Sequence, residues 1–229
     1  MKLIAVEIAR ATQVFINEEI RPLSGAYFPE SVRLVTERYG FAASPTDPEA
    51  SSAKFSTGRL ISGTRRINIS DATIFQSAVQ VTTVTNPDEA DYVVDDMMSW
   101  AINALAFREP QTIFPRHYES ALIVEFDREV DNLLRPFENL RAGFQRSLDS
   151  AYDLNSKVSF ATFAISSDPL QLAGQLLPPL SNVLKPELGL VRRANAPFSA
   201  NRFFSLAPLK TEAHRLLLEE FEQAIPGMN

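Results

Sequence analysis

The stretch from Lys54 to Leu105 constrains the fold most, because signals for strand, turn, strand and helix follow one another without a break. Gly63 tolerates a positive φ, so the chain can reverse there between two strands. Asn86 can accept a backbone hydrogen bond at a helix start, and Pro87 suits the first helical position. The stretch therefore predicts a β-hairpin followed by a capped helix, whose apolar stripe is Ala90, Val93, Val94, Met97, Ala101 and Leu105.

Signals on either side of this stretch complete the first part of the chain. Residues 2–16 predict a strand, residues 29–39 a short helix ending before Gly40, and residues 117–127 a strand with apolar and polar residues in alternation. Residues 1–127 therefore follow the order β-α-β-β-α-β, which is that of the ferredoxin-like arrangement.

The remaining residues, 128–229, predict a C-terminal extension. Helix signals cover 136–152 and 211–224, and strand signals cover 158–165 and 201–206. The first of these helices carries an apolar stripe formed by Phe137, Leu140, Phe144, Leu148 and Ala151. We expect an α+β fold with a mixed or antiparallel sheet, in which this helix-strand-strand-helix extension packs against the first part, either as a second domain or as one continuous domain. No internal repeat is evident.

Composition excludes several classes of protein. The chain has 229 residues, 45% of them apolar, which suffices for a core without disulfides or metals. It contains no cysteine, so disulfides, thiolate zinc sites and cysteine nucleophiles are excluded. A net charge of −6 provides no general attraction for nucleic acid. Glu7 and Arg10 interrupt the apolar N-terminus, so we expect neither a signal peptide nor a membrane span there. The absence of disulfides leads us to expect a cytoplasmic location. The preference for arginine over lysine suggests a bacterial source.

Familiar catalytic and nucleotide-binding signatures are absent. The sequence contains no GxGxxG, GxxxxGK[ST], GxSxG or HExxH. We therefore expect no cofactor and no resident metal, and favour a protein that is not an enzyme.

Acidic residues at the end of a predicted strand suggest an alternative to a non-enzymatic protein, namely a metal-dependent hydrolase or nuclease. Glu125 and Asp127 lie where a strand ends, and His117, at its start, could act as a general base. No lysine follows at the spacing typical of nucleases, so a solvated loop is the simpler interpretation. His214 is expected on a partly buried helix surface. Asp91 and Asp95 share a helix face that is expected to be solvated.

Three arginines supply a third hypothesis, a sensor of small anions. Arg59, Arg65 and Arg66 flank the turn at Gly63, and guanidinium groups bind phosphates and carboxylates. Strand alternation sends Arg65 and Arg66 to opposite faces, and a charged sheet edge that discourages aggregation is the competing interpretation.

The leading hypothesis rests on residues 170–191, which are leucine-rich and broken by prolines. Such a segment either covers the core or offers an apolar surface to another chain. We expect a non-enzymatic association protein, either a subunit or adaptor of a bacterial complex or a self-assembling unit. It would bind a protein partner through a sheet edge or through this segment, whose candidate contact residues are Leu176, Leu177, Leu180 and Leu184.

Overall fold

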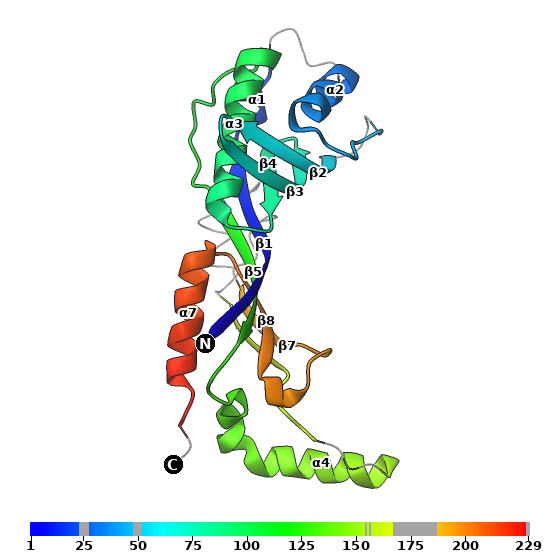
Figure 1. Cartoon of the computed structure of the whole chain (residues 1–229), viewed down its shortest axis with the longest axis vertical. Coiled ribbons are helices and arrows are strands. Elements are labelled where there is room, and N and C mark those ends of the chain that lie inside the picture. Colours follow the sequence, from blue (N-terminus) through cyan, green and yellow to red (C-terminus); the bar gives the residue numbers. More distant parts are fainter. Residues whose placement is uncertain (23–27, 48–51, 154, 156, 167–186, 228–229) are drawn as a thin grey trace.

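The computed structural model describes residues 1–22, 28–47, 52–153, 155, 157–166 and 187–227. Eight strands form one sheet in the order β2-β3-β4-β1-β5-β8-β7-β6, and every neighbouring pair is antiparallel. Helices and strands are present together, so the expected α+β class and antiparallel sheet are confirmed. The molecule is elongated, and α4 projects sideways at one end (Figure 1).

The sheet divides between its two central strands, β1 and β5. The first half contains β1 (Lys2–Val14), α1 (Asn17–Ile20), α2 (Phe28–Tyr39), β2 (Ser52–Ser62), β3 (Arg65–Phe75), β4 (Ala78–Thr83) and α3 (Pro87–Leu105). The second half contains β5 (His117–Glu125), the 3-10 helix η1 (Val130–Phe137), α4 (Glu138–Tyr152), β6 (Thr162–Ser166), β7 (Glu187–Arg192), the 3-10 helix η2 (Phe198–Ala200), β8 (Arg202–Ala207) and α7 (Thr211–Ala224).

The two halves repeat one topology. Outward from the β1–β5 pair, the sheet continues as β4, β3 and β2 on one side and as β8, β7 and β6 on the other. In the described residues, each half runs from its central strand through helix to three strands and a closing helix. The sequence shows no internal repeat, so this repeat is one of connectivity alone. The repeat lies in the connectivity, and a sequence reveals a repeat only when equivalent positions keep similar residues.

One predicted strand is in fact two, which changes the expected order of elements. The chain bends at Gln76 and Ser77, and β4 then folds back on β3, with Ile74 opposite Val79. Neither glycine nor proline marks this turn, so residues 73–85, which are rich in β-branched side chains, were predicted to continue one strand. Residues 1–127 consequently contain three consecutive strands where the ferredoxin-like order has two.

Local capping and turn predictions are confirmed. The Asn86 side chain accepts a hydrogen bond from the backbone N–H of Glu89 at 2.9 Å, and Pro87 opens α3. Gly63 and Gly40 have φ values of +58° and +57°, a region that glycine enters without steric cost. These two glycines end β2 and α2 where the sequence indicates.

The closing helix of each half packs on the sheet. Helix α3 lies against β1 and β4, and α7 lies against β1 and β5. In the first half α2 covers β2 as well, and it is fastened to α3. The Tyr39 hydroxyl donates to Asp96 Oδ2 at 2.7 Å, and Arg38 donates to the same carboxylate at 2.8 Å. The core of the first half therefore lies between the sheet and two helices.

The described ranges contain no helix that is both long enough and apolar enough to cross a membrane.

Candidate functional site

The residues of the hydrolase hypothesis do not form one site. His117 begins and Glu125 ends the nine-residue strand β5, so they lie about 26 Å apart. Arg202 Nε donates to Glu125 Oε1 at 2.8 Å. The Nε2 atom of His117 is buried and has no hydrogen-bond partner in the part of the chain that the structure describes, and burial lowers the pKa of this imidazole. Among the described residues, no carboxylate forms a hydrogen bond with that nitrogen.

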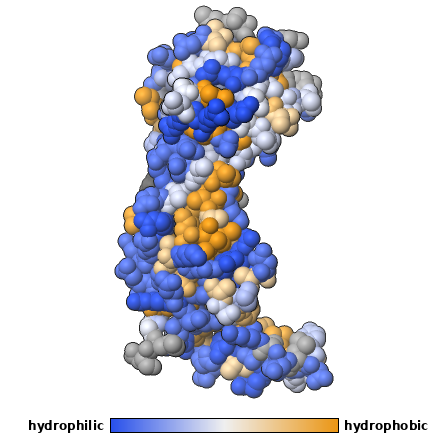
Figure 2. All heavy atoms as spheres, viewed as in Figure 1, coloured by the Kyte–Doolittle hydropathy of each residue, from blue (hydrophilic) through white to orange (hydrophobic). Residues whose placement is uncertain are grey.

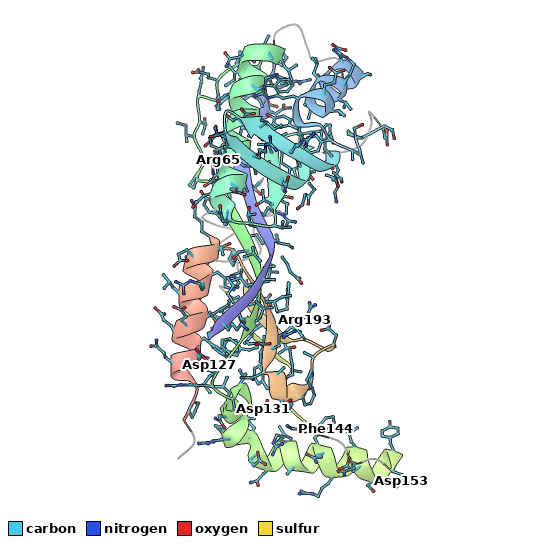
Figure 3. All side chains as sticks on the ribbon, in the orientation of Figure 1. Arg65, Asp127, Asp131, Phe144, Asp153 and Arg193 are labelled. Atoms are coloured by element: carbon cyan, nitrogen blue, oxygen red, sulfur yellow. The ribbon has the colours of Figure 1, made fainter. Side chains whose placement is uncertain are left out.

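Asp127 lies beside a cation of the protein itself. Its Oδ2 is 2.7 Å from the amino nitrogen of Met1, and its side chain is mostly exposed. Figure 3 shows Asp127 close to the end of α7 and far from Arg65. Within the ranges that the structure describes, no three histidine or acidic side chains are grouped so that they could hold a metal.

The arginines of the predicted anion site do not converge. Register pairs Arg59 with Asn68 and Ile61 with Arg66, so Arg59 and Arg66 share one face of the hairpin. Arg65 lies on the other face, where its guanidinium carbon is 4.4 Å from the ring centroid of Tyr92. The predicted separation of Arg65 and Arg66 follows from this alternation, and the anion sensor gains no support.

The face of α3 that carries Asp91 was expected to be solvated, but it is a junction between the halves. Arg116 donates to Asp91 Oδ1 at 3.2 Å, and the Tyr118 hydroxyl donates to Oδ2 at 3.0 Å. Lys210, just before α7, donates to Oδ2 at 3.1 Å, and these hydrogen bonds with Asp88 and Asp91 raise the lysine pKa. Arg116 also pairs with Asp95 at 2.7 Å. These acids therefore join α3 to the second half and already have cationic partners.

His214 is fully buried, which corrects the expectation of a helix surface. Its Nδ1 is 2.7 Å from Ser120 Oγ and its Nε2 is 2.8 Å from Ser205 Oγ. Burial lowers the imidazole pKa to about 4. The neutral ring has one N–H and one bare nitrogen, so one serine accepts from it and the other donates to it. His214 thus holds α7 to β5 and β8 and does not face solvent.

The candidate leucines Leu176, Leu177, Leu180 and Leu184 lie outside the described residues. The end of their segment, residues 187–191, belongs to strand β7, which the sequence did not predict. Leu190 on this strand is buried in the core of the second half.

The apolar stripe of α4 is at the surface. We define the α4 stripe as Phe137, Leu140, Phe144 and Leu148, which follow one another at helical spacing. No residue of α4 is buried, and the side chains of Phe137, Leu140 and Phe144 are 59%, 72% and 55% exposed. The periodicity of the sequence indicates this stripe, and the structure leaves its aromatic residues and Leu140 at the surface.

A second apolar area lies on the sheet of the second half. Ile123, Phe204 and Val191 are paired across β5, β8 and β7, and Val191 is 43% exposed. Strand alternation places them opposite Leu122 and Phe203, which face the core. Figure 2 shows an apolar patch midway along the molecule, where β1, β5 and β8 lie together. A large exposed apolar patch typically marks a surface for another molecule.

Sequence reasoning found the α4 stripe as a pattern but missed its exposure. A period of three and four residues is the same whether a helix packs within its own chain or against another chain. The sheet patch was harder to predict than the α4 stripe. Strands β5, β7 and β8 carry apolar residues on both faces, so their sequences do not indicate which face is exposed.

Comparisons with known proteins give no family. No family description matches the sequence, and no curated protein matches it. Among solved structures, Methanococcus jannaschii TBP aligns over 98% of both chains with 10% sequence identity and a TM-score of 0.44. Likeness at that level supports no inference about the fold or about what this chain binds.

Proposed function

We propose that this protein is a non-enzymatic, cytoplasmic association protein of a bacterium, and that the α4 stripe is the surface by which it assembles with a second copy of itself. The observation that carries the proposal is the contrast between α4 and α2. The two helices hold equivalent places in the repeat, but α2 buries Val35 and Tyr39, whereas α4 buries nothing.

The physical reason is the exposed apolar area. Burying one large apolar side chain stabilises by about 1.5–3 kcal/mol. Covering Phe137, Leu140 and Phe144 would therefore favour association by several kcal/mol before the entropy of association is subtracted. The ion pair Arg141–Glu138, at 2.5 Å, keeps part of the charge of α4 neutralised beside the stripe.

A second copy suits this surface better than nucleic acid does. The chain is acidic overall, and the stripe has no cluster of cations. A subunit or adaptor role in a larger complex would use the same stripe with another protein. His117 lies about 26 Å from Glu125 at the other end of β5, so this histidine and the acidic strand end do not share one site.

The test is the solution mass by light scattering after size exclusion. We expect a mass of about twice the 25.5 kDa monomer for the wild type. The double variant Leu140→Ser with Phe144→Ser should be monomeric and should keep the same circular dichroism and melting temperature.

Ile113→Ser is the matched control, because Ile113 is 86% exposed in the loop before β5 and lies outside α4. It should leave the mass unchanged. A wild type that stays monomeric at high concentration overturns self-assembly. A double variant that remains dimeric overturns the role of the α4 stripe.

A further inference from the structure

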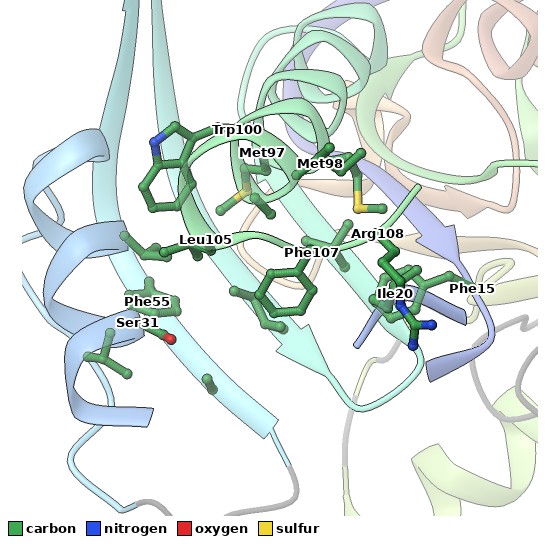
Figure 4. Close-up of a pocket in the computed structure, with 17 residues that line it drawn as sticks. Phe15, Ile20, Ser31, Phe55, Met97, Met98, Trp100, Leu105, Phe107 and Arg108 are labelled. Atoms are coloured by element: carbon green, nitrogen blue, oxygen red, sulfur yellow. The ribbon is translucent and has the colours of Figure 1, made fainter. Parts of the chain in front are cut away.

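The first half contains an apolar pocket that is independent of the α4 stripe. It lies between α2, α3 and the sheet, and its volume is about 230 Å³ (Figure 4). Its walls are carbon and sulfur almost throughout, including Phe55 from β2, Met97, Met98 and Trp100 from α3, and Phe107 from the following loop. Protein interiors are normally packed to leave few voids larger than one water molecule.

The pocket is large enough for a small organic molecule. An engineered apolar cavity of about 150 Å³ stays dry and binds benzene, so 230 Å³ corresponds to about nine heavy atoms. An apolar wall gives water too few hydrogen-bond partners to hold it. Met97 and Met98 can adjust to the shape of an occupant, because methionine is unbranched and polarizable.

One end of the pocket carries a positive charge. Arg108 lies beside Ile20 and Phe15, whereas Trp100 and Leu105 lie at the other end (Figure 4). Arg108 is exposed, so this end reaches the surface.

The guanidinium of Arg108 is held in place by backbone oxygens. Nε donates to the carbonyl of Arg21 at 2.8 Å, and Nη2 donates to the carbonyl of Glu18 at 2.8 Å. Among the described residues no carboxylate forms an ion pair with Arg108, and Nη1 keeps its donors for another acceptor. A positioned guanidinium with free donors is suited to a carboxylate.

We propose that this pocket binds a monocarboxylic acid with an unbranched apolar tail of about nine carbons. The tail fills the space between Phe55, Met97 and Trp100, and the carboxylate lies at the mouth beside Arg108. The ligand carries an unesterified carboxylate, because the one charged group among the described residues that line the apolar cavity is a single guanidinium at its surface end.

Trp100 supplies a direct reporter, because it is the single tryptophan of the chain and lines the pocket. Decanoate is titrated into the full-length protein below its micelle concentration, and tryptophan emission is followed together with calorimetry. We expect a saturable change in emission. 1-Decanol has the same tail without the charge, and we expect it to bind about fivefold more weakly, as suits an exposed ion pair.

Two substitutions test separately how the apolar tail and the carboxylate contribute to binding. Arg108→Gln should lower decanoate affinity to that of decanol and leave decanol binding unchanged. Ala101→Phe places a ring in the pocket from α3 and should abolish both titrations. Ala104→Phe is its matched control, because Ala104 is exposed on the same helix, and it should bind like the wild type.

The results that overturn the proposal are equally specific. Decanoate that leaves both emission and heat unchanged overturns the ligand class. Decanol that binds as tightly as decanoate overturns the role of Arg108. If Ala101→Phe binds decanoate as well as the wild type, the ligand does not bind in this pocket. This variant tests the pocket even if Arg108→Gln fails to fold.

Discussion

The two halves share one connectivity but use it differently. In the first half α2 and α3 both cover the sheet, and the core between them is apolar. In the second half α7 covers the sheet with a histidine at its centre, and α4 stands away with its stripe exposed. The comparison teaches that topology fixes where a helix can go, whereas side-chain complementarity decides whether it packs there.

The faces of the sheet away from these helices differ as well. Where the two halves meet, Thr82 of β4, Arg10 of β1 and Glu119 of β5 form a row of hydrogen bonds across three strands, with Arg10 donating to Glu119 at 2.6 Å. The corresponding surface of the second half carries Ile123 and Phe204. A polar row is stable against water, whereas an apolar one gains free energy when another surface covers it. Association is therefore expected at the second half.

The largest expected effect on the free energy of unfolding distinguishes a buried phenylalanine of the first half from an exposed one on α4. Phe55→Ala in the first half should lower the free energy of unfolding by about 3–5 kcal/mol, because the ring is fully buried and its loss leaves a cavity. Phe144→Ala in α4 should change the stability of the monomer by less than about 0.5 kcal/mol. Urea unfolding followed by circular dichroism measures both. Equal losses would mean that α4 packs within its own chain.

The buried histidine of the second half predicts a dependence on pH. Above pH 6.5, His214 is neutral in both the folded and the unfolded chain. Between pH 6.5 and about 4, the unfolded imidazole binds a proton that the buried one excludes, so stability falls as pH falls. The full loss is about 3 kcal/mol at and below pH 4.

The non-titrating variant His214→Gln provides the control for this prediction. Its free energy of unfolding should fall less steeply than that of the wild type between pH 6.5 and 4. Parallel curves for the two proteins, measured by urea unfolding at several pH values, would contradict a buried neutral imidazole.

A close backbone approach predicts an intermediate effect in the first half. A Cβ atom at Gly58 would lie 2.4 Å from the ring of Phe41, so Gly58→Ala must displace that ring from the core. We expect a loss of about 1–3 kcal/mol, as for other overpacked cores. Gly143→Ala in α4 meets only the end of the flexible Arg146 side chain and should not destabilise the protein. Thermal unfolding of both variants tests whether the two halves differ in packing as described.

The smallest expected effect concerns the start of α3. Asn86→Ala removes the hydrogen bond to the N–H of Glu89 and should cost about 1 kcal/mol. Asn86→Asp keeps an acceptor at that position and should cost much less. A melting temperature that falls equally for both variants would show that the cap contributes little.

The local elements were largely predictable from the sequence, because their causes are local. The cap at Asn86, the turn at Gly63 and the closing helix of residues 211–224 depend on residues within a few positions of one another. The turn at Gln76 and Ser77 was missed for the same reason. It carries no distinctive residue and is imposed by the pairing of β3 with β4.

The candidate sites were less predictable, because they depend on residues far apart in sequence. Nothing near His214 in the sequence indicates Ser120 and Ser205 as its partners, and nothing near Arg108 indicates the carbonyls of Glu18 and Arg21. The predicted strand already placed His117 and Glu125 at opposite ends. The hypothesis that they form one site required other parts of the fold to bring them together, which does not happen.

The α+β class, the position of most helices and strands, and the apolar stripe of α4 could be predicted from the sequence alone. Those features follow from periodicity, capping and turn chemistry, which act over a few residues. Contacts between distant parts of the chain set the repeated topology of the halves, the burial of His214 and the exposure of the α4 stripe. Pairing between distant strands and packing between distant helices set these outcomes, because burial depends on which surfaces meet in space.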